Sequence, residues 1–284
     1  MKRALLSLGL VAFAVAACTG TTGDEIITFP AYAAGVQGAS EPFTVNGWTI
    51  QLTLAQMYVG ALYVNEAPAG PGFDTPACIN TGIYAAQVPG GLEVNLLSTK
   101  SQRFSVQGSG TADLGQSWEI WLTNGDVNNT ENTGADLPNI VDLQGNATRV
   151  SDGAQFTWAA TVNINQSNRG VPSTDPSQPG LNPICKQRIV ELSGIHLQLS
   201  AGGSLQMTVD PRGWFNLPID FSSLPSVASD ECEIDQSSSY GTAQYCIPDT
   251  SFATGLGAIQ GVNLYTGIFT AGTAGYELSY GATP

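Results

Sequence analysis

Two short stretches in the second half of the chain alternate strictly between apolar and polar residues. In residues 195–199, Ile and Leu alternate with His and Gln, and the pattern resumes in residues 205–209 after Ala201, Gly202 and Gly203. A period of two is typical of a β-strand with one buried face, and a short glycine turn between two such runs is typical of a hairpin. We therefore predict two antiparallel strands joined by this turn.

Further strands are expected along the rest of the chain. Asn46–Gly47 and Asp152–Gly153 are dipeptides that favour tight turns between strands. The first turn precedes an alternating run, and the second lies between two apolar runs. The expected strands are Trp48 to Leu54, Met57 to Val64, Leu92 to Leu97, Trp118 to Leu122, Ala147 to Val150, and Phe156 to Ile164.

The chain offers little that predicts helices. Only 11% of its residues are charged, and it contains 33 Gly and 16 Pro. Long amphipathic helical patterns and apolar runs long enough to span a membrane as a helix are both absent. We predict an all-β fold, an antiparallel β-sandwich-like domain over residues 25–284 with long Pro/Gly-rich loops. The loop at 167–183 is either a surface loop or a boundary between two β halves.

The first eighteen residues have the features of an export signal. Lys2 and Arg3 precede an apolar stretch, residues 4–17, which is too short to span a bilayer. The stretch ends in Val15, Ala16, Ala17 and Cys18, which resembles the lipobox of type II signal peptides. This resemblance implies a bacterial lipoprotein precursor that is cleaved after residue 17 and carries lipid on Cys18.

The resemblance also implies a location. Residues 18–24 would form a lipidated tether, and lipid would make the membrane a partner of the protein. Thr19 occupies the position where Asp indicates retention in the inner membrane, so the outer membrane is expected. The alternative is an ordinary signal peptide with an unlipidated cysteine, which keeps export and removes the anchor.

Four cysteines remain beside Cys18. An even number in an exported chain favours two disulfides. We expect Cys232 to pair with Cys246, and Cys78 with Cys185. Metal ligation is the alternative, but the closely spaced cysteine pairs of zinc sites are missing.

The charge of the chain bears on its partners. Removal of residues 1–17 takes away two basic residues and no acidic one, and so changes the net charge from −14 to −16. Such a surface repels nucleic acid, so no nucleic-acid partner is expected. It favours solubility, cations or basic partners.

No catalytic motif is present. His196 is the only histidine, and it lies on the polar side of an expected strand, as a surface histidine does. Sequence motifs of serine hydrolases, zinc proteases and nucleotide-binding loops are missing. A pair of carboxylates remains an alternative source of catalysis, as in glycosidases. The acids on or near expected strands are Glu93, Glu119, Asp142 and Glu191.

One segment has the spacing of a calcium loop. Asp126, Asn128 and Thr130 are two residues apart, and Asp136 follows. These residues resemble the start of an EF-hand loop, but Glu131 and Leu137 stand where that loop needs Gly and Glu. The segment is either a polar surface loop or a weak calcium site.

The chain has five tryptophans: Trp48, Trp118, Trp121, Trp158 and Trp214. Most aromatic residues on strands belong to the core, but several exposed together would form a platform for carbohydrate or a patch for a protein partner. Trp118 and Trp121 are three apart and so face opposite sides of a regular strand, which leaves one of them a candidate for exposure.

The strand at 205–209 and the following residues, 210–215, resemble methanobactin-associated periplasmic proteins, a β-rich group linked to copper. The match covers about ten residues. One histidine and, after signal removal, two methionines leave few copper ligands. The sequence therefore favours a lipid-anchored envelope protein that is a binding or structural surface module, with an envelope protein or a glycan as partner. A carboxylate-dependent hydrolase and a metal-associated protein are the alternatives.

Overall fold

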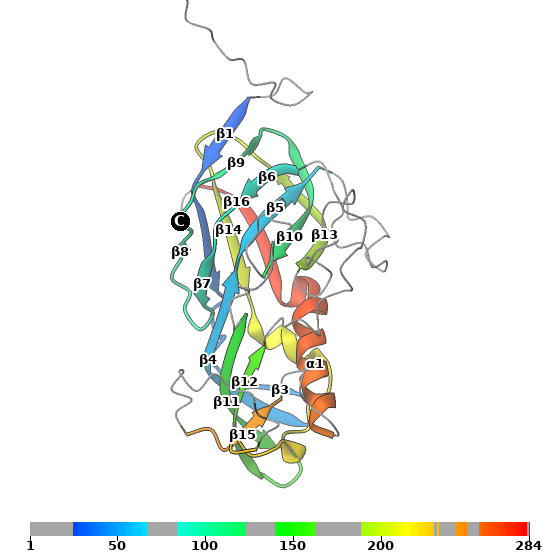
Figure 1. Ribbon diagram of the computed structural model, residues 1–284. Coiled ribbons are helices and arrows are strands. Elements are labelled where there is room, and N and C mark those ends of the chain that lie inside the picture. The colour runs from blue at the N-terminus through cyan, green and yellow to red at the C-terminus, as the bar shows by residue number, and fades with distance from the viewer. Residues whose placement is uncertain are drawn as a thin grey trace, which may run out of the picture.

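The computed structural model describes residues 25–66, 84–122, 140–162, 189–229, 232, 242–248, 256–282 and 284. Most of them lie in strands that form three sheets, and helices are few. The molecule is elongated, with β1 at one end and the strands of the third sheet towards the other (Figure 1). The β-rich prediction is therefore confirmed. One sheet is antiparallel throughout, but the other two each contain one parallel pair, which the predicted antiparallel fold did not include.

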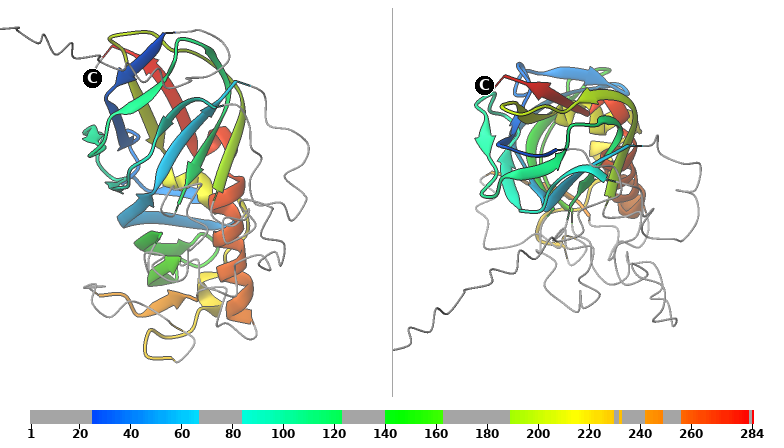
Figure 2. Two further views of the ribbon diagram at one scale, coloured as in Figure 1. Left: turned by 45° about the horizontal axis from the view of Figure 1, so that its top comes forward. Right: turned by 90° about the horizontal axis from the view of Figure 1, so that it is seen from above.

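Sheet A is antiparallel throughout. Its strands, in spatial order, are β1 (Ile26–Phe29), β9 (Gly108–Thr111), β6 (Tyr84–Val88), β5 (Ala61–Asn65), β10 (Leu114–Trp121) and β13 (Ile189–Gln198). Sheet B contains one parallel pair, β14 with β2. Its order is β16 (Tyr276–Gly281), β14 (Ser204–Val209), β2 (Ala31–Gly35) and β8 (Gln102–Arg103). Seen from above, the strands of sheets A and B surround the core of their half of the molecule (Figure 2).

Sheet C lies in the half of the molecule away from β1 (Figure 1). Its order is β15 (Tyr245–Ile247), β12 (Gln155–Val162), β11 (Val141–Arg149), β4 (Trp48–Val59) and β3 (Phe43–Val45), and β7 (Leu92–Asn95) also pairs with β4. The pair of β12 and β15 is parallel. Most buried apolar side chains of all three sheets belong to one continuous hydrophobic cluster.

The long strand β4 runs further than its alternation predicts. A bulge opposite Gln144 and Gly145 shifts its buried positions from even numbers, such as Ile50 and Leu52, to odd ones, such as Met57. The sequence predicted a break between Leu54 and Met57, but the strand continues through these residues without one. The chain leaves sheet C at Gly60 and enters sheet A as β5.

Both dipeptide turns are confirmed. Asn46 and Gly47 have φ values of 48° and 82°, as a two-residue hairpin turn requires. Val45 and Trp48 pair directly across this turn. The second turn, with Gly153 at φ 75°, joins β11 to β12.

The strands expected at 195–199 and 205–209 exist, but they do not form a hairpin. β13 pairs with β10 in sheet A, whereas β14 pairs with β16 and β2 in sheet B. The turn between them therefore carries the chain from one sheet to the other. Gly203 packs so closely against the ring of Tyr280 that an added Cβ would lie 2.3 Å from it.

One α-helix was not expected from the sequence. α1 (Leu256–Thr270) lies along sheet C and packs against the 3₁₀ turn η3 (Pro211–Asn216) (Figure 1). Gln260 ties it to a second turn, η4 (Phe221–Ser223), by accepting a hydrogen bond from the Asp220 amide at 2.8 Å. A third turn, η5 (Gly272–Ala274), leads into β16.

The expected pair Cys232–Cys246 forms a disulfide, with its Cα atoms 5.9 Å apart. It attaches residue 232 to the buried Cys246 of β15. Cys78, Cys185 and the loop 167–183 lie outside the described residues. The second expected disulfide and the suggested domain boundary therefore stay predictions.

Candidate functional site

An open recess lies at the end of sheet C that carries the β3–β4 and β11–β12 turns. Its volume is about 520 Å³, within the range of ligand sites in proteins. We call it the Arg149 groove. It is lined by Asn46, Gly47, Trp48, Arg149, Val150, Ser151, Asp220 and Ser222.

Two strand turns form one wall of this groove. The amide of Val150 donates a hydrogen bond to the carbonyl of Gly47 at 2.9 Å, which holds the β11–β12 turn against the β3–β4 turn. Asn46 donates from Nδ2 to the Phe215 carbonyl at 3.3 Å and so attaches the wall to η3. The wall is therefore fixed by hydrogen bonds between segments distant in the sequence.

Arg149 is the only basic side chain among the groove residues. Its guanidinium lies 5.3 Å from the ring centre of Trp48 and 5.7 Å from that of Phe156, within range of cation–π attraction. Its Nη1 donates to Asp152 Oδ2 at 3.3 Å. Because this ion pair is well exposed to solvent, it contributes little stability by itself. The aromatic rings therefore orient a cation that a ligand can reach.

Asp220 supplies acceptors on the other wall. Its Oδ1 accepts hydrogen bonds from the amide of Ser222 at 3.0 Å and from the Ser222 hydroxyl at 2.6 Å. The carboxylate therefore caps the short turn η4 while its residue stays exposed. The groove thus combines a guanidinium donor with a carboxylate acceptor.

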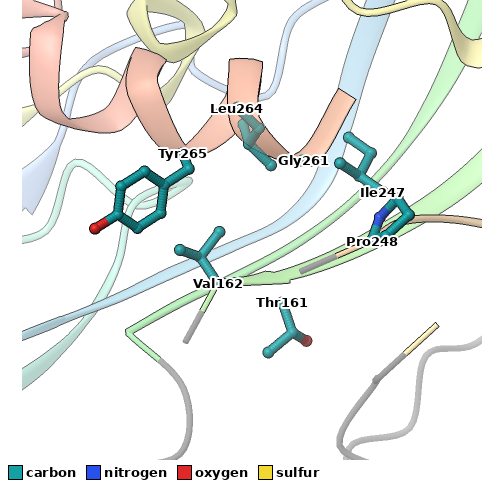
Figure 3. A pocket seen from close by; sticks show the side chains of 7 residues that line it. All are labelled: Thr161, Val162, Ile247, Pro248, Gly261, Leu264 and Tyr265. Atoms are coloured by element: carbon teal, nitrogen blue, oxygen red, sulfur yellow. The ribbon is translucent and has the colours of Figure 1, made fainter. Parts of the chain in front are cut away.

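A smaller pocket lies under α1. Figure 3 shows Thr161 and Val162 of β12, Ile247 and Pro248 at the end of β15, and Gly261, Leu264 and Tyr265 of α1 around it. The cavity between them measures about 10 Å³, far less than a ligand site occupies. We therefore regard it as a packing gap between helix and sheet.

A buried polar cluster lies on the face of sheet A that is turned away from the main core, which we call the outer face. Ala61, Tyr63 and Trp121 form a separate small cluster there, with Tyr84 packed against it. Glu119 lies beside them on β10 and is 2% exposed.

Glu119 is held by two neutral donors. Its Oε2 accepts a hydrogen bond from Trp121 Nε1 at 2.9 Å, and its Oε1 accepts one from Asn65 Nδ2 at 3.2 Å. Burial nevertheless dominates and raises the pKa of the Glu119 carboxyl, although both hydrogen bonds act to lower it. Burial, and next the nearby Glu119, also raise the pKa of the Tyr84 hydroxyl.

This cluster leads to a prediction about pH. Because the pKa of Glu119 is raised by folding, its stabilising contribution is complete below the pKa of the unfolded chain and is lost as pH rises through the folded pKa. We therefore expect Glu119→Gln to increase the free energy of unfolding at pH 7 by about 1–3 kcal/mol. This is the usual cost of burying a polar group whose hydrogen bonds to water are not fully replaced in the protein.

Urea unfolding between pH 4 and pH 8 measures this effect. The wild-type protein should lose stability relative to Glu119→Gln as the pH rises, and the two should converge towards pH 4. Asp142→Asn is the matched control, because Asp142 is only half-buried in sheet C and accepts a hydrogen bond from the Thr161 hydroxyl. Loss of stability in Glu119→Gln at pH 7 would contradict the argument.

The four acids considered from the sequence are not gathered into one site. Glu93 is exposed on β7, and Asp142 lies on β11. The backbone positions of Glu119 and Glu191 are directly opposite in the register of β10 and β13. His196 is exposed on β13, as expected.

The tryptophans form no exposed platform. All five are buried, and the most accessible of them, Trp48, is only 6% exposed. The suggestion that Trp118 or Trp121 is exposed is wrong, because β10 is buried on both faces. A carbohydrate platform of tryptophans is therefore excluded as the binding surface.

Several expected sites lie outside the described residues: Cys18, and the proposed calcium ligands Asp126, Asn128, Thr130 and Asp136. In the described ranges, no three His, Cys, Asp or Glu side chains gather closely enough to hold a metal. Within the same ranges, no helix has the length and apolar character of a membrane span. No protein-family model, no curated protein and no solved structure matches this chain.

Proposed function

We propose that this chain is an exported lipoprotein, anchored to the outer membrane through Cys18, whose single β-sandwich-like domain binds a glycan in the Arg149 groove. The groove is the observation that carries the proposal. It has the size of a ligand site and presents both donor and acceptor side chains. Sugar hydroxyls donate and accept hydrogen bonds at once and so suit such a lining.

The position of the groove supports this proposal. Cys18 precedes Glu25 by seven residues, which span at most about 25 Å of extended chain. A lipid on Cys18 would hold the end of the molecule that contains β1 near the membrane. The turns of sheet C lie towards the opposite end (Figure 1). The groove would therefore face away from the membrane, towards envelope polymers.

The disulfide supports export. Disulfides persist in oxidising compartments, and Cys232–Cys246 forms one. The two alternative functions have weaker support. A catalytic acid must contact its substrate, whereas Glu119 is 2% exposed. Met57 and Met207, which are potential copper ligands, are both fully buried in the core.

The anchor is tested by mass spectrometry of protein extracted from membranes without reduction. We expect a diacyl or triacyl mass on Cys18, and a gain of about four hydrogens on reduction if both disulfides form. Cys18→Ser is the control, and it should move the protein from the membrane to the soluble fraction. An unlipidated N-terminus in the wild-type protein would overturn the anchor.

Glycan binding is tested with an array of bacterial envelope polysaccharides and the chain from residue 19 onward. Calorimetry then measures affinity for a ligand found on the array. Arg149→Ala should weaken binding about tenfold or more, because a hydrogen bond to a charged group contributes about 1.5–3 kcal/mol. Arg149→Lys should restore only part of it, because lysine lacks the planar fork of donors.

Glu277→Gln provides the matched control for a lost surface charge. Glu277 is exposed on β16, which belongs to sheet B, and the variant should bind as tightly as the wild-type protein. Binding that survives Arg149→Ala unchanged would place the glycan elsewhere. No binding to any glycan on the array would overturn the assignment and leave a protein as the partner of the groove.

A further inference from the structure

The guanidinium of Arg149 offers a ligand only part of its set of donors. Nη1 donates to Asp152 Oδ2 at 3.3 Å, and Nε is buried without a hydrogen-bond partner among the described residues. Nη2 donates to no described residue, and the side chain is about one-third exposed. Nη2 is therefore the nitrogen through which Arg149 can donate to a ligand in the groove without competition.

This arrangement disfavours an acidic ligand. A carboxylate or phosphate binds arginine best through two parallel hydrogen bonds along one edge of the guanidinium. The edge formed by Nε and Nη2 is closed to a ligand, because Nε is buried. The edge formed by Nη1 and Nη2 lies beside the Asp152 carboxylate, which would repel a second anion. Arg149 is therefore placed to donate a single hydrogen bond to a neutral oxygen.

The charge around the groove has the same effect. Asp220 lines the groove and Asp152 lies beside it, so two carboxylates surround the one guanidinium. The whole chain has a net charge of −14. A polyanionic glycan would therefore be repelled both inside the groove and during its approach to the protein.

The opposite wall of the groove presents an acceptor. Asp220 Oδ1 accepts the hydrogen bonds from the amide and the hydroxyl of Ser222, which fix the direction of the carboxylate. Oδ2 accepts none from any described residue, and Asp220 is exposed. A ligand N–H or O–H group can therefore donate to Oδ2, and a bond to a charged acceptor is about twice as strong as one to a neutral acceptor.

Val150 adds an apolar surface to the groove. It is 61% exposed, the largest value among the exposed large hydrophobic residues that the structure describes. Its position is fixed, because its amide donates to the carbonyl of Gly47. A methyl group on a ligand would remove part of this side chain from water, which is favourable.

We propose that the unit recognised in the groove is an uncharged 2-acetamido sugar. Its amide oxygen accepts from Arg149 Nη2, its amide N–H donates to Asp220 Oδ2, and its methyl group packs on Val150. A trans amide directs its C=O and N–H groups in opposite directions, which suits a donor and an acceptor on facing walls. This inference rests on the proposed glycan function and narrows the ligand to polymers of N-acetylated amino sugars.

Calorimetric titration of the full mature chain with three matched tetrasaccharides tests the proposal. All are β-1,4-linked glucose derivatives: the N-acetylglucosamine tetramer, the glucose tetramer and the glucuronate tetramer. The first has an acetamido group where the second has a hydroxyl, and the third has a carboxylate. We expect the acetamido tetramer to bind about tenfold or more tightly than the glucose tetramer, since it gains a hydrogen bond to a charged group. The glucuronate tetramer should bind most weakly.

Asp220→Asn tests the acceptor. The asparagine oxygen can still accept from the Ser222 amide and cap η4, but an NH₂ group then replaces Oδ2. The acetamido tetramer should lose about tenfold or more in affinity, because two N–H donors would face each other. The glucose tetramer should change little, because a hydroxyl can either donate or accept.

Asp152→Asn tests the exclusion of acids and keeps the proposal falsifiable if Asp220→Asn does not fold. Asp152 is exposed, and asparagine can still accept from the Ala154 amide as Asp152 does. Removal of its charge should strengthen binding of the glucuronate tetramer about tenfold, because both nitrogens of the outer edge become available to a carboxylate. Glu277→Gln, which removes a distant charge, should leave all three affinities unchanged.

The outcomes separate this proposal from the glycan function itself. Equal affinity for the acetamido and glucose tetramers, or tighter binding of the glucuronate tetramer to the wild-type protein, would overturn the proposal. If the acetamido tetramer does not bind while another glycan binds in an Arg149-dependent manner, the proposal fails and the glycan function stands. If no glycan binds at all, the glycan function fails and this proposal fails with it.

Discussion

Replacement of Trp158 by alanine is expected to lower the free energy of unfolding by about 3–5 kcal/mol, the range for truncating a large aromatic residue in a core. Trp158 is fully buried on β12. Its ring centre lies 5.3 Å from that of Phe221 and 5.8 Å from that of Phe215. It therefore fills the space between sheet C and the turns η3 and η4. Alanine would leave a cavity at this junction.

Urea denaturation followed by circular dichroism measures this loss. Trp158→Phe is the matched control, and it should lose much less stability because it keeps an aromatic ring in place. It also removes an indole Nε1 that is buried without a hydrogen-bond partner. Because Phe221 also packs against Trp48 of the Arg149 groove, at 5.3 Å, glycan binding should weaken in Trp158→Ala. Less than 1.5 kcal/mol of destabilisation, roughly the cost of a volume-conserving swap, would show that neighbouring side chains collapse into the space.

Local patterns in the sequence predicted the strands better than their partners. The turn at Asn46–Gly47 was predictable because two successive residues with positive φ strongly favour this dipeptide. Alternation likewise identified the buried face of β14. It could not reveal that β14 pairs with β2 and β16, because alternation specifies a face of a strand and carries no information about its neighbour.

Helix α1 shows where pattern reasoning fails. The segment has no charged residue and contains Gly257, Gly261 and Gly267, each about 1 kcal/mol less favourable in a helix than alanine. Its stability must come from packing, as is common for helices in proteins. Gln260 is 7% exposed and donates from Nε2 to the Ser223 hydroxyl at 3.3 Å, a contact that no local pattern indicates.

The candidate sites depend on contacts between distant segments. The Arg149 groove combines residues 46–48, 149–151 and 220–222, and the sequence singled out only its two turns and Trp48. Glu119 and Glu191 were both considered as acids on strands, but their pairing follows from the register of β10 and β13. The indole of Trp121, two residues from Glu119, is the one local signal, because residues i and i+2 of a strand share a face.

Gly267→Ala is expected to destabilise the protein by about 1–3 kcal/mol, the usual effect of overpacking. In an exposed helix this substitution would stabilise by about 1 kcal/mol. Here an added Cβ would lie 1.9 Å from the backbone carbonyl oxygen of Trp214, which belongs to η3. A backbone atom cannot turn away as a side chain can, so α1 and η3 must separate. The helix is also attached to η4 through Gln260, and the shift should therefore reach the Arg149 groove.

The Tm of Gly267→Ala, with Gly281→Ala as the control, distinguishes the effect of packing between α1 and η3 from the effect of alanine's higher helix propensity. Gly281 ends β16, has no atom within 4 Å of an added Cβ, and lacks a positive φ, so its substitution should change Tm little. A lower Tm in Gly267→Ala alone, with weaker glycan binding, would show that close contact between α1 and η3 supports the groove. A higher Tm in Gly267→Ala would mean that helix propensity outweighs packing there, and that α1 can move away from η3 at no cost.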